Sequence, residues 1–271
     1  MNVTVTGEKN QRLSNRLADL KRVVVAFSGG VDSSFLLHRA VEILGKEAKA
    51  CLVVSESLAA TERTRAKETA LALGVELVEL IESELALPGI AENPLNRCYH
   101  CKNLSFTAIR NWAETQGIVH LLDGTNADDL SEYRPGLLAK DERGVISLLA
   151  EVGMTKAEIR SLSKEAGLAV WDKPSNPCLN SRIPYGEPIT LEKLQQIEQG
   201  ETLLRELGFT QLRLRHHGEL ARIEVPQDDF TAVIREQERL TQGLGAMGFR
   251  FITLDLAGLR SGSFDPKKEQ S

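Results

Sequence analysis

The sequence predicts an α/β protein with two parts, a doubly wound parallel sheet followed by a small α+β domain. Apolar runs of strand length alternate with helix-patterned segments over residues 1–173, as expected for right-handed βαβ units. The first run, residues 23–27, is apolar throughout, which is typical of a parallel strand buried on both faces. Residues 174–188 then hold four prolines, and we interpret them as a linker to a second domain at 189–271.

Apolar periodicity and glycines place the elements of the first domain. Leu13, Leu17 and Leu20 share one face of the first predicted helix, and each later helix is followed by a glycine that can end it. The predicted helices are residues 10–21, 33–44, 61–73, 104–115 and 156–166, and the predicted strands are 23–27, 50–54, 75–81 and 119–122. The segment 82–97 contains Pro88 and Pro94, so we expect a loop there.

The second domain is expected to combine two helices with three strands. The helices are predicted at residues 191–207 and 230–244, and the strands at 211–215, 221–225 and 250–254. This mixture predicts a small α+β unit. The polar tail from Arg260 is expected to fray.

Composition excludes several classes of protein. The chain has 271 residues, 33 basic against 38 acidic side chains, and a net charge of −5, which argues against a long nucleic acid as the main partner. No apolar run approaches the length of a membrane span, and the first residues do not resemble a signal peptide. We therefore expect a cytoplasmic protein without membrane partners, whose four cysteines stay reduced.

The strongest functional signal is SGGVDSS at residues 28–34, directly after the first buried strand and at the start of a helix. Gly29 and Gly30 let the backbone approach a ligand closely, and the helix N-terminus favours an anion. Asp32 would repel a bare phosphate, so its presence indicates a magnesium ion. The motif lacks the spacing and the lysine of a Walker loop. Three hydroxyl groups are candidate ligands as well: Ser28, Ser33 and Ser34.

This motif resembles the PP-loop of the ATP pyrophosphatases, which cleave ATP between the α and β phosphates. DGTNADD, at residues 123–129 after the fourth predicted strand, resembles a second element of that class. The resemblance implies the adenine-nucleotide alpha hydrolase type of fold. It also implies that Gly124 and Asp128 help to bind the nucleotide. A ligand site at the carboxyl ends of the strands is general in open α/β sheets.

The four cysteines divide into one core residue and three candidates for chemistry. Cys51 lies in the apolar run ACLVV and is expected to pack in the core. Cys98 and Cys101 form one CxxC at the start of a helix, which indicates either a shared metal or cluster, or simply two helix-cap thiols. Cys178 lies in a polar, proline-rich segment, where a thiol is either reactive or idle.

The wider pattern resembles the LarE family, the ATP-dependent sulfur insertases that build the nickel-pincer nucleotide cofactor of lactate racemase. Beside the PP-loop and residues 123–129, the resemblance rests on EYRPG at 132–136 and PCLNSRIPYG at 177–186. It extends from the first helix to Arg260 and includes RLR at 213–215 and LDLAG at 254–258. The cysteine in the motif at 177–186 is not shared by all PP-loop enzymes, which makes the resemblance specific.

The resemblance implies a reaction and a set of site residues. The substrate would be pyridinium-3,5-biscarboxylic acid mononucleotide, one carboxylate of which is adenylated by ATP with Mg²⁺ and then receives sulfur as a thiocarboxylate. Cys178 matches the family's sulfur-bearing thiol, either sacrificed or joined with Cys98 and Cys101 around a [4Fe-4S] cluster that passes on sulfide from a donor. The remaining nucleotide- or substrate-binding candidates are Ser55, Gly124, Asp128, Arg134, Arg182, Arg213 and Arg215.

Charged residues of the second domain are candidates for phosphate and metal binding. Arg213 and Arg215 alternate along a strand, so both point to one face, where they either bind the substrate 5′-phosphate or form a solvated charged face. By resemblance, Glu201 and Asp229 lie near them and hold a metal at a subunit junction, and the protein forms a homo-oligomer, typically a hexamer. We assign no role to the adjacent residues 216 and 217, both histidines.

Three other functions compete with this interpretation. A tRNA thiolase also combines a PP-loop with three cysteines, but the net charge of −5 and the lack of a basic arm count against it. An ammonia-dependent amidating synthetase would not need Cys178. A non-catalytic nucleotide sensor would bind ATP without releasing pyrophosphate, and it would need neither Asp32 nor Cys178.

The three-cysteine pattern makes a direct prediction. Anaerobic reconstitution with iron and sulfide should give a brown protein with the broad visible absorbance of a [4Fe-4S] cluster, because three thiolates can hold such a cluster with one iron left open. Cys98→Ala should lose this absorbance, whereas Cys51→Ala should keep it. A colourless reconstituted protein, together with full activity of Cys98→Ala, would contradict the prediction.

Overall fold

The computed structural model describes residues 3–131, 136–260 and 264, and the chain divides into two compact units. The first unit comprises Met1–Glu84 and Asn96–Ser175, and the second comprises Leu85–Leu95 and Asn176–Ser271. The second unit therefore includes a segment from the middle of the chain that the sequence did not separate from the first.

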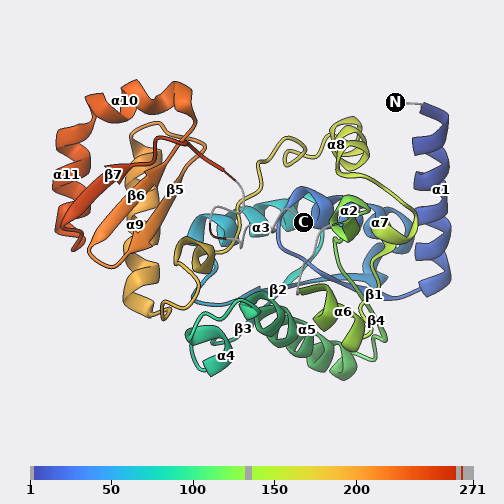
Figure 1. Cartoon of the computed structure of the whole chain (residues 1–271). Helices are drawn as coiled ribbons and strands as arrows, with labels where there is room; N and C mark the ends of the chain where they lie inside the picture. Colours follow the sequence, from blue (N-terminus) through green and yellow to red (C-terminus); the bar gives the residue numbers. More distant parts are fainter. Residues whose placement is uncertain (1–2, 132–135, 261–263, 265–271) are drawn as a thin grey trace, which may run out of the picture. The chain divides into compact units, whose positions relative to one another are not determined.

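The first unit contains a four-stranded parallel sheet with the order β3-β2-β1-β4 (Figure 1). Its strands are β1 (Val23–Ala26), β2 (Ala48–Val54), β3 (Leu77–Ile81) and β4 (His120–Leu122). Val23 pairs with Ala48 on one side and with His120 on the other, and all pairings are parallel. The predicted doubly wound parallel sheet is confirmed. The chain adds strands on one side of β1 and then returns to its other side, so β1 and β4 flank the switch point of the sheet.

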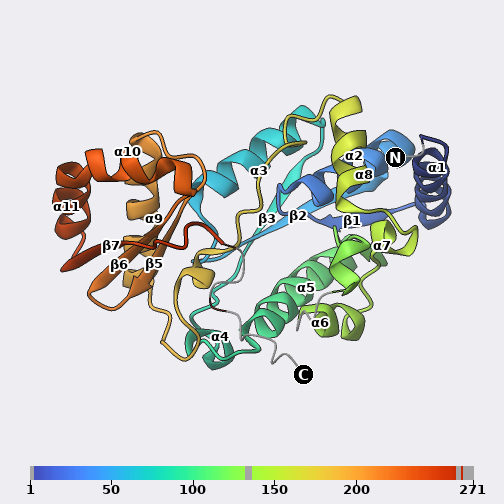
Figure 2. The ribbon, with the colours of Figure 1, turned by 45° about the horizontal axis from the view of Figure 1, so that its top comes forward.

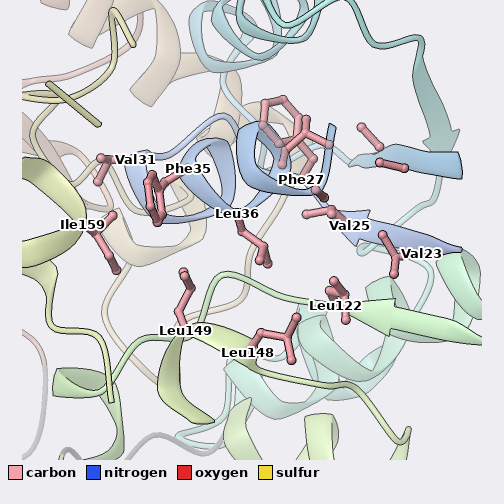
Figure 3. Close-up of a cluster of buried hydrophobic side chains, with 14 of the residues drawn as sticks. Val23, Val25, Phe27, Val31, Phe35, Leu36, Leu122, Leu148, Leu149 and Ile159 are labelled. Atoms are coloured by element: carbon pink, nitrogen blue, oxygen red, sulfur yellow. The ribbon is translucent and has the colours of Figure 1, made fainter. Parts of the chain in front are cut away.

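Helices cover both faces of this sheet (Figure 2). Val23 and Val25 point to one face, where they pack with Leu36 of α2 and Ile159 of α8, and Figure 3 shows this core. Val24 points to the opposite face and packs against α5. The helices of the first unit are α1 (Val3–Leu20), α2 (Val31–Leu44), α3 (Ala60–Ala72), α5 (Arg97–Thr115), α6 (Gly136–Glu142), α7 (Leu148–Glu151) and α8 (Lys156–Glu165).

Two helices begin earlier than their apolar patterns indicate. α1 begins at Val3 rather than residue 10, because polar side chains of its first turns are held by α8: Lys9 Nζ lies 2.8 Å from Glu158 Oε2. α5 begins at Arg97 rather than residue 104, and the Arg97 side chain is buried at 2% exposure. Both extensions depend on polar contacts, which apolar periodicity does not detect.

The second unit contains a three-stranded sheet with the order β5-β6-β7. β5 (Arg213–His217) and β6 (Leu220–Glu224) are antiparallel, and β7 (Phe251–Leu254) joins β6 in parallel. The helices are α4 (Pro88–Ala91), α9 (Leu191–Glu206), α10 (Phe230–Arg235) and α11 (Gln237–Ala246). The predicted small α+β unit is thus present, although its second long helix is divided at Glu236, whose φ of −90° and ψ of 13° depart from the helix.

A central polar residue joins the segment 85–95 to the rest of the second unit. Asn93 is fully buried with a φ of 56°, and its side-chain amide donates to the carbonyl oxygens of Ile183, Pro184 and Glu187 at 3.3, 2.7 and 3.1 Å. Gly186 in turn donates its N–H to the Asn93 carbonyl at 2.9 Å. The predicted loop at 82–97 therefore contains the short helix α4 and a buried asparagine that organises residues 183–189.

Short 3₁₀ turns connect several of these elements. The 3₁₀ turns are Gly45–Glu47, Asp128–Ser131, Leu179–Arg182 and Gln227–Asp229. Over the residues with described positions, none of the helices is both long and apolar enough to span a membrane. Apart from Arg260 and Phe264, the predicted polar tail lies outside the described residues.

Gly200, in the core of the second unit, has no room for a side chain. A Cβ on Gly200 of α9 would lie 2.3 Å from Leu214 Cδ2 and 2.9 Å from Leu244 Cδ2. Gly200→Ala should therefore destabilise the unit by about 1–3 kcal/mol through overpacking. Gly245→Ala on α11 is the matched control, since a Cβ there meets nothing within 4 Å.

Hydrogen exchange of the α9 amides, followed by mass spectrometry, checks this prediction. Faster exchange is expected in Gly200→Ala, while Gly245→Ala should exchange at the wild-type rate or more slowly, because alanine favours a helix by up to ~1 kcal/mol. Equal protection of α9 in Gly200→Ala and wild type would contradict the packing argument.

Candidate functional site

The loop between β1 and α2 has the geometry of an anion site. Gly29 takes the left-handed conformation with a φ of 67°, and the Gly30 N–H points toward Ser28 Oγ at 3.4 Å. Ser28 Oγ and Ser33 Oγ lie 3.0 Å apart, and Ser33 Oγ also donates to the Gly30 carbonyl at 3.2 Å. Ser34 is fully buried, and no described group bonds its hydroxyl. Backbone N–H groups and two hydroxyls thus gather at the N-terminus of a 14-residue helix.

Two glycines let this loop pack closely against neighbouring elements. A Cβ on Gly29 would lie 2.9 Å from both Cα and Cβ of Ala66 on α3. A Cβ on Gly124, in the loop after β4, would lie 2.8 Å from the Ser33 backbone nitrogen. The two sequence motifs therefore meet at the carboxyl ends of β1 and β4, the switch point where α/β sheets bind ligands.

Asp32 is a half-buried carboxylate at the start of α2. Its Oδ2 pairs with Lys156 Nζ from α8. Its Oδ1 is buried with no well-formed hydrogen bond, and the nearby Asn126 amide lowers the pKa of the carboxylate less than burial raises it. Burial raises the pKa of Asp32 above 3.8, and the Lys156 ammonium only partly opposes this. A carboxylate oxygen left unsatisfied beside a phosphate loop fits a hard cation such as Mg²⁺.

The loop at 123–129 is ordered by its own acidic side chains. Asp123 accepts bonds from the hydroxyls of Thr125 and Ser147, both at 2.5 Å. Asn126 Oδ1 accepts the Asp128 N–H at 2.9 Å, and Asp128 Oδ2 accepts the N–H of Lys156 at 2.8 Å. Asp128 therefore fixes the start of α8 beside the loop.

Two other predicted nucleotide contacts have different outcomes. Ser55 follows β2, and its hydroxyl lies 3.3 Å from that of Ser57. Arg134, in the motif at 132–136, lies outside the described residues. Their roles stay predictions.

Two lysines and one glutamate at the phosphate loop were not identified as site residues from the sequence. Lys156 pairs with Asp32. Lys173 Nζ donates to the Gly29 carbonyl at 2.9 Å and to Glu62 Oε2 of α3 at 2.7 Å. No local pattern signals the contact of Lys173 with the loop, because 144 residues separate it from Gly29 in the sequence.

Cys178 lies on a tightly held loop in the second unit. Its side chain is exposed, and its carbonyl accepts bonds from the N–H and the hydroxyl of Ser181 at 3.0 and 2.8 Å. Arg182, at 0% exposure, donates to the carbonyl oxygens of Pro177 and Cys178 at 2.8 and 3.3 Å and to Asn176 Oδ1 at 2.8 Å. The predicted ligand-binding arginine thus binds the loop that carries the thiol.

Arg182 is balanced by Glu201 of α9, which is 1% exposed. Arg182 Nε lies 2.8 Å from Glu201 Oε1, and Arg205 Nη2 lies 2.8 Å from Glu201 Oε2. Glu201 Oε1 also accepts the Leu214 N–H at 3.2 Å. Because breaking a buried ion pair leaves an uncompensated charge, Arg182 and Glu201 depend on each other. Asp229 is half-buried at the start of α10, and metal binding by Glu201 or Asp229 stays a prediction.

Arg213 and Arg215 are both buried on β5, at 8% and 3% exposure. Arg213 Nη1 donates to the Arg260 carbonyl at 2.7 Å, and Arg215 donates to the Ser181 carbonyl at 2.6 Å and to Glu224 Oε2 at 2.9 Å. Burial lowers the pKa of both guanidinium groups. They do not form the solvated charged face that was the alternative.

The two histidines that follow these arginines have different surroundings. His216 Nε2 lies 2.9 Å from Gln196 Oε1, its ring packs on Phe249, and burial lowers its pKa to about 4. His217 packs on Phe264 instead. Both contacts are consistent with packing, and we assign neither histidine a chemical role.

Cys98 and Cys101 lie near the N-terminus of α5, three residues apart and half-buried. Arg97 Nη2 lies 3.8 Å from Cys98 Sγ, which places a buried guanidinium beside this thiol. Two thiols on one helical turn beside a positive charge fit iron as a ligand pair. Cys51 is fully buried and its thiol pKa is raised to about 12, as expected for a core residue.

No group of three or more His, Cys, Asp or Glu side chains in the described part of the chain is placed to hold a metal ion. The fit of magnesium rests on Asp32 Oδ1, and the fit of iron rests on the paired thiols of Cys98 and Cys101.

Comparison with known protein families shows which class of protein the first unit resembles. Residues 10–130 match the asparagine synthase family, and this segment holds the PP-loop and the loop after β4. Together with the parallel sheet and its switch point, this defines a PP-loop α/β unit.

Three relatives cover nearly the whole chain. A pyridinium-3,5-bisthiocarboxylic acid mononucleotide synthase of Lactiplantibacillus plantarum is 36% identical over 255 residues, 94% of this chain and 92% of that protein. Uncharacterised proteins of Synechocystis and Methanocaldococcus jannaschii are 41% and 32% identical, over 95% and 92% of this chain and 97% and 96% of their own lengths. The chain belongs to the LarE family, the PP-loop ATP-dependent sulfur transferases.

Replacing the half-buried carboxylate of Asp32 with a neutral amide should stabilise the protein at neutral pH. Since the pKa of Asp32 is raised in the folded state, the folded protein binds the carboxyl proton of Asp32 more tightly than the unfolded chain does. Wild type therefore loses stability as pH rises from 3.8 through the raised pKa. Asp32→Asn, which has no such penalty, should be more stable than wild type at pH 7 and should lose this advantage below pH 3.8.

Thermal unfolding between pH 3.5 and 8 measures the difference, with the exposed Asp141→Asn on α6 as the control that should match wild type. An Asp32→Asn protein that is less stable than wild type at pH 7 would show that the Lys156 pair outweighs the cost of burial.

Proposed function

We propose that the chain adenylates a carboxylate of pyridinium-3,5-biscarboxylic acid mononucleotide and replaces one of its oxygens with sulfur. The observation that carries the proposal is an exposed thiol, Cys178, on a loop fixed by a fully buried arginine, in a chain that also has a PP-loop. The name of the Lactiplantibacillus relative supports the substrate. The product would serve the synthesis of a nickel-pincer cofactor, such as that of lactate racemase.

The first step is carboxylate activation. A substrate carboxylate oxygen attacks the α-phosphorus of ATP, the bond to the β-phosphate bridging oxygen breaks, and pyrophosphate leaves. The backbone N–H groups around Gly30 and the hydroxyls of Ser28 and Ser33 would stabilise the charge on the departing diphosphate. Asp32 would hold Mg²⁺, which when bound neutralises phosphate charge.

The second step transfers sulfur. The Cys178 thiolate attacks the acyl carbon of the acyl-adenylate, and AMP leaves with the original carboxylate oxygen. Removal of the Cys178 α-proton and cleavage of its Cβ–S bond then give the thiocarboxylate and a dehydroalanine residue. Arg182 keeps the loop in position by binding the carbonyls of Pro177 and Cys178.

A cluster would change the source of the sulfur. Cys98, Cys101 and Cys178 would hold a [4Fe-4S] cluster, which when bound supplies sulfide, so that all three cysteines keep their own sulfur.

We propose Arg213 and Arg215 as ligands of the substrate 5′-phosphate, with paired donors suited to phosphate. We also propose that the protein is cytoplasmic and forms a homo-oligomer, a hexamer by resemblance.

Intact-mass analysis after turnover tests the proposal. Protein incubated with ATP, Mg²⁺ and the dicarboxylate nucleotide should release AMP and pyrophosphate and form thiocarboxylate. Cys178→Ala should still release pyrophosphate in a first turnover, but thiocarboxylate should fall by about a hundredfold or more, because the acceptor of the acyl group is gone. Cys51→Ala is the control.

The mass separates the two sulfur sources. Loss of one sulfur from the Cys178 peptide marks the sacrificial route, and an unchanged peptide mass after several turnovers marks the cluster route. A Cys178→Ala protein that forms thiocarboxylate at the wild-type rate would contradict the proposal, and one that forms an amide from ammonia would favour an amidating synthetase.

A further inference from the structure

The peptide group between Gly29 and Gly30 is unusual in this chain because glycine stands on both sides of it, and no other Gly-Gly pair occurs in the sequence. Neither residue has a Cβ to restrict rotation, so the sequence alone does not determine which way this peptide points. Two orientations compete, one with the N–H toward the anion site and one with the carbonyl there. Only the first can bind a phosphate.

Lys173 contacts this peptide on its carbonyl side. Its Nζ donates to the Gly29 carbonyl at 2.9 Å, while the Gly30 N–H points toward Ser28 Oγ at 3.4 Å. The peptide is trans, so its C=O and N–H point in opposite directions. A lysine that binds the carbonyl therefore directs the N–H toward the hydroxyls of the phosphate loop.

The lysine is itself held in place from several sides. Glu62 Oε2 lies 2.7 Å from Lys173 Nζ, and both side chains are only 11% exposed. Arg160 of α8 donates to the carbonyls of Trp171 and Lys173, both at 2.7 Å, which fixes the backbone of the turn. An ammonium fixed by a carboxylate and a clamped backbone is preorganised for one contact.

We propose that Lys173 is a positioning residue that selects the phosphate-binding orientation of the Gly29–Gly30 peptide. It acts through the backbone and need not touch the nucleotide. The inference rests on the proposed function in one respect, since it takes the loop to be the diphosphate site. Glu62 supports the same role by holding the Lys173 ammonium.

The single Gly-Gly pair makes the orientation directly observable. With glycine labelled by ¹³C at the carbonyl and ¹⁵N at the amide, one-bond carbonyl–nitrogen correlation gives a single signal, that of Gly29 and Gly30. Magic-angle-spinning NMR records it whatever the size of the assembly. Lys173→Met should shift or split this signal in the ligand-free protein and weaken binding of inorganic pyrophosphate about ten- to a hundredfold, as expected for a lost charged hydrogen bond.

Two variants serve as comparisons. Lys173→Arg retains a cationic donor and should restore the signal and most of the pyrophosphate affinity. Lys46→Met, an exposed lysine in the turn after α2, should match wild type in both measurements. A Lys173→Met protein with an unchanged signal and pyrophosphate affinity within twofold of wild type would overturn the proposal.

A folding defect would not leave the proposal untested. If Lys173→Met does not fold, Glu62→Gln retains the side-chain shape and removes the charge that holds Lys173, so it should broaden or shift the signal and weaken pyrophosphate binding severalfold. An unchanged signal and affinity in Glu62→Gln would then overturn the inference. If wild type itself fails to bind pyrophosphate, the proposed function fails, while the ligand-free signals still test the role of Lys173.

Discussion

The first unit depends on close backbone contact at places where only glycine fits. Gly29 lies against Ala66 of α3, and Gly124 lies against the backbone at Ser33, with less than 3 Å available for an added Cβ at either position. These contacts bring the loops after β1 and β4 together at the switch point of the sheet. The N–H groups of the phosphate loop can then face one concavity, and Asp32 is half-buried beside it, with its Oδ1 left without a hydrogen bond.

Cations that bind backbone carbonyls recur in both units. In the first unit Lys173 binds the Gly29 carbonyl, and in the second Arg182 binds those of Pro177 and Cys178. Each cation has a buried or nearly buried carboxylate partner, Glu62 or Glu201. Loops have few apolar contacts to fix them, so charged hydrogen bonds to carbonyls supply the rigidity that chemistry at their tips requires.

The sequence predicted the features that depend on local signals. The buried strand β1, the glycine loop and the helix that follows it are contiguous, and each has a physical signature within a few residues. Lys173 was not predicted to contact the phosphate loop and Asn93 was not predicted to matter, because their partners lie 144 and about 90 residues away in the chain. α7 has four residues, too few to show a helical period, and the break at Glu236 has no proline or glycine to mark it.

Oxygen transfer from substrate to AMP tests the central claim most directly. The carboxylate oxygens of the pyridinium nucleotide are labelled with ¹⁸O, and the released nucleotide and phosphates are analysed by mass spectrometry after one turnover. If the loop holds pyrophosphate while the carboxylate attacks the α-phosphorus, AMP should carry one ¹⁸O atom and pyrophosphate none. Label in inorganic phosphate, or ADP as the nucleotide product, would contradict the account.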